Sequence, residues 1–262
     1  MPVTLLDDVR PDESDHPFLP GMSRGWLMPW YDVVARFRGL GRLYRRTAVV
    51  AGVRPGEHVL DVGCGTGNLT REILRTAPDA VVTGLDPDGD SLRRAAGKLR
   101  RRPAEVTLVR GFAHRLPVAD GSQDHVVSSL ALHHVPLAEK VLLAGEIARV
   151  LGPGGTVTIA DFAGDHGSAH HHGHGDAAHD GPDARSSHAE PGGPHAHDDG
   201  AHRHRPGGRQ PGHGPGSRTH DADNADGGIE RLLAGAGLTD ARAVGRMPLL
   251  GDEVVFVQAR RA

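Results

Sequence analysis

The chain has 262 residues, a formal net charge of −3 and a single cysteine. This charge gives no reason to expect nucleic acid as a partner, and one cysteine excludes an internal disulfide framework. The hydrophobic fraction is 37%, beside 37 glycines, 19 prolines and 19 histidines, which is low for a chain that folds throughout. We therefore expect one globular domain with a substantial appendage.

Nothing in the sequence indicates export or membrane insertion. Residues 1–16 are acidic and lack the basic start and apolar stretch of a secretory signal. No apolar run approaches the roughly 20 residues of a membrane-spanning helix. The expectation is a cytoplasmic protein without a membrane span, whose oligomeric state the sequence does not indicate.

Short apolar runs alternate with helical patterns in the middle of the chain. The runs that read as buried strands are His58–Val62, Ala80–Leu85, Val106–Val109, His125–Ser129 and Thr156–Ala160. Apolar residues at helical spacing predict helices over Asn68–Thr76, Ser91–Arg102 and Leu137–Leu151. This alternation predicts an α/β fold with a doubly wound, mostly parallel sheet.

The alternation stops after Phe162. Residues 164–227 consist almost entirely of Gly, His, Asp, Pro, Ala, Ser and Arg, a composition that predicts disorder. A helical pattern resumes at Ile229, and two strands are predicted over Ala241–Arg246 and Glu253–Ala259. The predicted division is an N-terminal cap or lid over 1–52, one domain from 53–163 and 228–262, and a disordered insert over 164–227.

A glycine-rich turn follows the first predicted strand of that domain. Gly63, Gly65 and Gly67 alternate behind Asp61, and they let the backbone turn tightly and approach a ligand. A dinucleotide-binding turn has the spacing G-x-G-x-x-G and offers its helix N-terminus to a pyrophosphate, which a preceding carboxylate would repel. Asp61 instead suits a ligand that carries a cation. This spacing argues against the alternative of a nicotinamide-dependent oxidoreductase.

A second acid, Asp86, follows the next predicted strand. Its carboxylate is placed to accept hydrogen bonds from both hydroxyls of a ribose. It lies about 25 residues beyond Asp61, close to the spacing of the ribose-binding acid in βαβ nucleotide sites. The alternative for Asp86 alone is a turn or capping residue before Pro87.

Five segments stand out in order along the chain: VLDVGCGTGNLT, GLDPDGDSLRRA, GFAHRLP, DHVVSSLALHHV and EIARVLGPGGTVTIADF. In order and spacing they resemble the successive motifs of class I S-adenosylmethionine-dependent methyltransferases. The branch that they resemble most is the quinone-biosynthesis-like group with small-molecule acceptors. The resemblance covers about residues 30–162 and the final helix and strands. It implies a seven-stranded Rossmann-like sheet whose last strand is antiparallel, and S-adenosylmethionine as the cofactor.

The resemblance also implies which residues contact the cofactor. Asp61 would bind the methionine ammonium and Asp86 the ribose, while Phe112 and Ala113 would line the adenine. The family often has an acid where this chain has Phe112. The alternative for Phe112 is a role in the hydrophobic core. Ser128 and Leu130 match positions near the methionine end, with simple packing as the alternative. The full set of predicted cofactor contacts is Tyr31, Asp61, Gly63, Cys64, Gly65, Gly67, Asp86, Pro87, Phe112, Ala113 and Ser128.

A sulfonium methyl is already activated, so that catalysis chiefly requires holding an acceptor in line and excluding water. If the acceptor must lose a proton, His133 and His134 are the candidate catalytic bases, and packing or capping is the alternative for each. Six of the nine aromatic residues precede the first predicted strand, which suggests a lid with Tyr31 as its cofactor contact, or packing on the sheet. These six are Phe18, Trp26, Trp30, Tyr31, Phe37 and Tyr44.

Thirteen histidines lie between His166 and His220. Neutral imidazole binds Ni, Zn, Cu or Co, and the densest run supplies His170, His171, His172 and His174 as candidate metal ligands. Such a metal would not be required for the chemistry. The alternative function is therefore a metal-binding protein on a methyltransferase-like fold, with the insert as reservoir or sensor.

Overall fold

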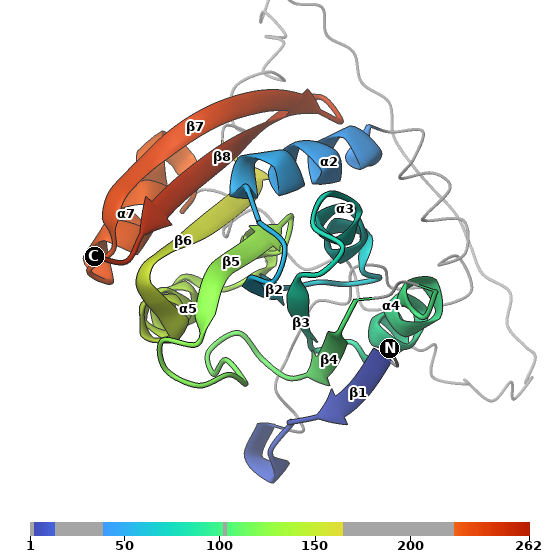
Figure 1. Cartoon of the computed structure of the whole chain (residues 1–262). Coiled ribbons are helices and arrows are strands. Elements are labelled where there is room, and N and C mark those ends of the chain that lie inside the picture. The colour runs from blue at the N-terminus through green and yellow to red at the C-terminus, as the bar shows by residue number, and fades with distance from the viewer. Residues whose placement is uncertain (1–2, 14–38, 102–103, 165–222) are drawn as a thin grey trace, which may run out of the picture. The chain divides into compact units, whose positions relative to one another are not determined.

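The computed structural model describes residues 3–13, 39–101, 104–164 and 223–262. Within them lies one sheet of eight strands in the order β1-β4-β3-β2-β5-β6-β8-β7 (Figure 1). The strands are β1 (Val3–Asp7), β2 (His58–Val62), β3 (Val81–Asp86), β4 (Val106–Arg110), β5 (Gln123–Ser129), β6 (Leu151–Phe162), β7 (Thr239–Leu249) and β8 (Asp252–Arg260). Strand β8 is antiparallel to both of its neighbours, and the other pairs are parallel. The predicted fold class and the antiparallel last strand are confirmed.

Strand β1 is an addition to the predicted seven. It forms the edge of the sheet and pairs in parallel with β4, with Val3 opposite Val106 and Asp7 opposite Arg110. Four of its five residues are exposed, because one side of an edge strand has no neighbour to bury it. Residues 3–7 therefore belong to the sheet, although they were assigned to the N-terminal cap.

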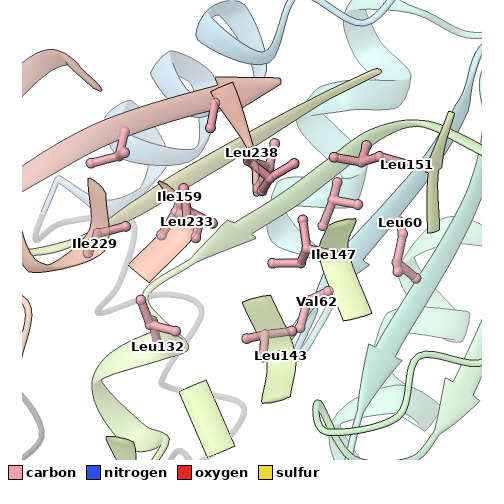
Figure 2. Packing of buried hydrophobic residues seen from close by; sticks show 14 of the residues in the cluster. Leu60, Val62, Leu132, Leu143, Ile147, Leu151, Ile159, Ile229, Leu233 and Leu238 are labelled. Atoms are coloured by element: carbon pink, nitrogen blue, oxygen red, sulfur yellow. The ribbon is translucent and has the colours of Figure 1, made fainter. Parts of the chain in front are cut away.

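The helices cover both faces of the sheet. They are α2 (Leu40–Ala51), α3 (Asn68–Thr76), α4 (Gly89–Leu99), α5 (Leu137–Val150) and α7 (Gly228–Gly235). Side chains of α2, α3 and α4 pack in one core cluster with Val59, whereas those of α5 and α7 pack in another with Leu60. The split arises because successive residues of a strand point to opposite faces. Figure 2 shows the second cluster, where Leu60 and Val62 meet Leu143 and Ile147.

Helix boundaries follow their capping residues. Helix α3 has the predicted bounds and begins after Gly67, which adopts a left-handed conformation with a φ of 74°. Helix α4 begins two residues before its predicted start, because the side chain of Asp88 accepts a hydrogen bond from the Asp90 N–H (2.9 Å).

Helix α2 occupies part of the segment that was interpreted as a cap or lid. Its Leu43 is fully buried, and its Tyr44 packs against two core clusters. For Tyr44 the alternative of packing is therefore confirmed. Phe18, Trp26, Trp30, Tyr31 and Phe37 lie outside the described residues, so the lid remains a prediction.

The two chain segments that flank the predicted insert meet beside α5. Lys140 is 1% exposed, and its Nζ donates to Oδ1 of Asn224 (3.0 Å) and lies 3.6 Å from Oδ2 of Asp223. Nδ2 of Asn224 donates in turn to the carbonyl of Phe162 (3.3 Å). Through these contacts, the buried Lys140 holds the end of β6 beside Asp223 and Asn224. Among the helices described, none is long and apolar enough to cross a membrane.

Candidate functional site

The glycine-rich turn lies at the carboxyl ends of β2 and β3. The N–H groups of Gly63 and Cys64 donate to the carbonyl of Leu85 (2.8 and 3.0 Å), which fixes the turn over β3. Gly63 has a φ of +71°, and a Cβ there would lie 2.3 Å from Cβ of Ala131. A Cβ on Gly65 (φ +50°) would meet nothing within 4 Å. The backbone at Gly65 therefore borders open space that a ligand can fill.

Asp61 lies at the end of β2 and is 1% exposed. Its Oδ2 accepts a hydrogen bond from the hydroxyl of Thr70 on α3 (2.6 Å). Burial raises the pKa of Asp61 to about 7, and the nearby charge of Asp86 adds to this effect. Ionised Asp61 is unfavourable without a partner, and a cationic ligand would stabilise it. The site therefore favours a ligand that carries a positive charge.

Asp86 ends β3 and is partly exposed. Its Oδ2 accepts from the Gly65 N–H (2.8 Å) and its Oδ1 from the Asp88 N–H (2.9 Å). Burial raises the pKa of Asp86 to about 6. Since a carboxylate has about four lone-pair sites, these two bonds leave capacity for further donors such as ribose hydroxyls. Asp86 therefore supports the turn and also lies at the predicted ligand position.

Three other predicted contacts have structural roles. Cys64 is 6% exposed, and its Sγ lies so close to Gly84 that a Cβ there would be 2.9 Å away. Burial raises the pKa of its thiol well above the usual value, so the thiol is neutral. The carbonyl of Pro87 accepts from Nε of Arg110 (3.2 Å). Gly67 lies against α4, where a Cβ would be 3.0 Å from that of Ala95.

The loop after β4 contains the two residues predicted to line the adenine. Phe112 is 8% exposed and its ring stacks on that of His114, with the centroids 5.9 Å apart. Ala113 is partly buried against the core cluster that includes α5. The Gly111 N–H donates to the carbonyl of Asp86 (3.3 Å), so this loop lies beside the ribose-binding candidate.

The end of β5 contains a serine that the sequence analysis missed. Ser128 was predicted and is 5% exposed, but Ser129 is 8% exposed and its hydroxyl has no hydrogen-bond partner within the described part of the chain. An unsatisfied buried hydroxyl is costly and suggests a missing partner. Leu130, which follows, has a φ of 56°, an uncommon conformation for a non-glycine residue. Strain and an unsatisfied hydroxyl thus coincide at this strand end.

A buried carboxylate, also missed, accompanies one of the candidate bases. Asp161 near the end of β6 is fully buried, and its Oδ1 lies 2.8 Å from Nδ1 of His133. The same carboxylate accepts from the N–H groups of Leu132 (2.8 Å) and Phe162 (2.8 Å). The His134 ring is tilted against that of His133, with the centroids 3.9 Å apart. His133 is therefore oriented by a buried carboxylate.

The remaining predicted site residues, Tyr31 and the candidate metal ligands His170, His171, His172 and His174, lie outside the described residues. Within residues 3–13, 39–101, 104–164 and 223–262, no three His, Cys, Asp or Glu side chains are grouped as metal ligands. The metal site stays a prediction.

Comparison with known proteins agrees with this geometry. Residues 59–155 match the family model described as a methyltransferase domain. Demethylmenaquinone methyltransferase of Beutenbergia cavernae is 41% identical over 126 residues, which cover 48% of this chain and 49% of that protein. The enzyme of the same name from Thermus thermophilus is 33% identical over 139 residues, covering 52% and 62%. The chain thus spans about half to three-fifths of these relatives' length.

A solved structure extends the comparison to most of the chain. The S-adenosylmethionine-dependent methyltransferase from Aquifex aeolicus superposes with a TM-score of 0.53 at 15% identity, covering 88% of this chain and 98% of that one. This likeness shows the fold alone. The motif order and the matched family model identify residues 59–155 as a class I S-adenosylmethionine-dependent methyltransferase domain, similar to those of the demethylmenaquinone methyltransferases.

Proposed function

We propose that this chain transfers the methyl group of S-adenosylmethionine to a small, lipophilic acceptor with an aromatic hydroxyl group, such as a quinol. The observation that carries the proposal is the pair Asp61 and Asp86, whose carboxylates lie at adjacent strand ends close enough for one to raise the pKa of the other. The acceptor class is suggested by the names of the relatives and by the carboxylate-oriented His133.

The site's chemistry fits the cofactor. The buried Asp61 suits the ammonium, the partly exposed Asp86 has capacity for the ribose hydroxyls, and the unsatisfied hydroxyl of Ser129 offers a further hydrogen bond. The open space over Gly65 admits a ligand close to the backbone. We assign these residues to cofactor binding, with Phe112 and Ala113 at the adenine.

Asp61 and Asp86 would hold S-adenosylmethionine, which would supply an activated methyl group with a neutral thioether as the leaving group. His133 prepares the acceptor. With Asp161 accepting from Nδ1–H, the neutral imidazole has its lone pair on Nε2, which takes the hydroxyl proton. The electron pair stays on the acceptor oxygen or on its conjugated ring carbon, either of which can attack. The buried Asp161 stabilises the imidazolium that results.

The first experiment is a screen with methyl-labelled cofactor. Lipophilic phenols and quinols are compared with small amines and with methyl ethers of the same phenols. We expect label in the phenols and quinols alone, because the ethers have no proton for His133 to remove. Label in the amines or in none of the compounds would overturn the proposed acceptor class.

Variants at the histidines test the assigned base. His133→Gln should reduce kcat by about 100-fold, in the range of general-base catalysis, while S-adenosylhomocysteine still binds. Asp161→Asn should also reduce kcat and should raise the KM for the cofactor little. His134→Gln is the matched control, since it changes the neighbouring ring without touching Asp161. A larger loss in His134→Gln than in His133→Gln would transfer the role to His134.

A divalent metal on the histidine-rich segment is a separate and weaker candidate. It rests on the thirteen histidines of the sequence alone. Calorimetry with Ni²⁺ and Zn²⁺ on the full chain and on a chain lacking residues 164–222 tests it. Equal binding by the two proteins would remove this function from the segment.

A further inference from the structure

The unpredicted N-terminal strand continues into a short segment that contacts the loop after β4. After β1 the Asp8 N–H donates to the carbonyl of Arg110 (2.8 Å). This bond continues the parallel pairing of β1 and β4 by one residue. A single 3-10 turn, η1 (Pro11–Glu13), follows. These residues lie beside Phe112–Arg115, the loop that holds the two adenine candidates.

Arg115 binds the N-terminal segment at several points. Its Nη1 donates to Oδ2 of Asp8 (2.5 Å), and its Nη2 donates to the Asp8 carbonyl (2.6 Å) and to Oε2 of Glu13 (3.1 Å). The guanidinium therefore spans a carboxylate, a backbone carbonyl and a second carboxylate. Such a multidentate contact fixes both distance and orientation, as a single ion pair does not.

Glu13 completes this arrangement from the other side. It is 6% exposed, although it lies in a turn whose other two residues are exposed. Its Oε1 lies 2.9 Å from Nε2 of His114, and its Oε2 accepts from the Arg10 N–H (2.8 Å). The His114 ring stacks on Phe112. A chain of contacts thus runs from Glu13 through His114 to the aromatic residue assigned to the adenine.

The charge on Glu13 is stable. The hydrogen bond from the Arg10 N–H, with those from Arg115 and His114, lowers its pKa to about 2. Its contribution to stability is complete above the ordinary carboxyl pKa and is lost only as the pH falls through about 2. Glu13 therefore stays ionised over any pH range in which the protein would be assayed.

We propose that Asp8, Glu13, His114 and Arg115, here named the Glu13 cluster, hold the adenine loop in its binding conformation and so set the affinity for the adenosine part of the cofactor. Glu13 and Asp8 are positioning residues, because they act through His114, Arg115 and Phe112. The inference rests on the proposed function, which assigns the loop to the adenine. A loop fixed before binding loses less conformational entropy on binding, which is the physical basis of the effect.

The test compares Glu13→Gln with Asp12→Asn in the full chain. Asp12 is the neighbouring acid of the same turn and is exposed, so its neutralisation controls for charge and location. Dissociation constants for S-adenosylhomocysteine are measured by calorimetry, and those for adenosine by competition, both well below the melting temperature. Asp61→Asn is the contrasting variant, since it acts on the amino-acid end.

We expect Glu13→Gln to weaken S-adenosylhomocysteine and adenosine by the same factor, about tenfold, as for the loss of one charge-assisted hydrogen bond. Asp61→Asn should weaken only S-adenosylhomocysteine, and Asp12→Asn neither ligand. With a Michaelis analysis, Glu13→Gln should raise the KM for the cofactor and leave kcat unchanged. Asp8→Asn, at a more exposed position, should act in the same direction and is available if Glu13→Gln fails to fold.

Contrary outcomes separate the two proposals. If the unaltered protein binds neither ligand, the proposed function and the Glu13 cluster fail together. If it binds both and Glu13→Gln binds them equally well, only the cluster fails. A loss confined to S-adenosylhomocysteine, or an equal loss in Asp12→Asn, would also overturn the cluster's assigned role.

Discussion

Replacing Asp61 with asparagine should stabilise the protein and weaken its affinity for S-adenosylhomocysteine. Asparagine has the same shape, and its carbonyl can still accept the hydrogen bond from Thr70. What is lost is the charge. Because the carboxylate is 1% exposed and close to Asp86, ionising it in the ligand-free protein is unfavourable.

The magnitude follows from the pKa of Asp61. Folding raises it from 3.8 to about 7, so the folded state binds the proton more tightly than the unfolded chain. Below about pH 4 Asp61 is protonated in both states and does not lower the free energy of unfolding of the wild type. As the pH rises toward about 7, where Asp61 ionises in the folded protein, this free energy declines. Three pKa units at about 1.4 kcal/mol each set an upper limit of about 4 kcal/mol. The asparagine variant should escape this loss.

The assay is urea unfolding at several pH values between 5 and 8, with Asp79→Asn as an exposed control. The free energy of unfolding of Asp61→Asn should exceed that of the wild type by an amount that grows with pH. Calorimetry on the same samples should measure weaker binding of S-adenosylhomocysteine by the variant than by the wild type. Lower stability at pH 8, or binding of wild-type strength, would refute the electrostatic role of Asp61.

Four further outcomes are expected. The affinity for S-adenosylhomocysteine should rise between about pH 5 and pH 8, since the ammonium binds the ionised form of Asp61 (pKa about 7) and the ribose hydroxyls donate to the ionised form of Asp86 (pKa about 6); titration calorimetry across that range measures it. Gly63→Ala should lower the free energy of unfolding by more than about 2 kcal/mol in urea titrations, because its Cβ would lie 2.3 Å from that of Ala131 at a positive φ. Gly41→Ala in α2, where a Cβ meets nothing, should instead add about 0.5–1 kcal/mol. Treatment with EDTA should leave the methyl-transfer rate unchanged, because no step of the proposed chemistry needs a metal.

Strong local patterns predicted much of the fold. Helix α3 has its predicted bounds because the glycine-rich turn and the apolar spacing specify the same start and end. The central strands were found because short buried apolar runs mark them, Val59 and Leu60 in β2 and Val126 and Val127 in β5. Strand β1 has no such pattern, since most of its residues are exposed. Its position depends on pairing with β4, far away in the sequence.

The site was predicted in the parts that motifs describe. Asp61 and Asp86 lie at adjacent strand ends as expected, because neighbouring parallel strands bring their carboxyl ends together. Asp161 was missed because an acid at the end of an apolar strand gives no sign of its partner. Its role becomes visible only when the turn after β5 brings His133 to it. Ser129 was likewise missed, because the sequence does not show that its buried hydroxyl finds no partner among the described residues.

The edge position of β1 has a consequence for the order in which the sheet assembles. Its partner residues lie about a hundred positions later, from Val106 onward, so the first strand of the chain cannot pair until much of the central sheet exists. A late-formed, solvent-exposed edge is also the first to open locally in the native state. Amide hydrogen exchange at Leu5 and Leu6 should thus be faster than in β2, and a nucleoside held by the neighbouring loop should slow it. Exchange protection of these β1 amides would then measure ligand occupancy, although the amides themselves do not contact the ligand.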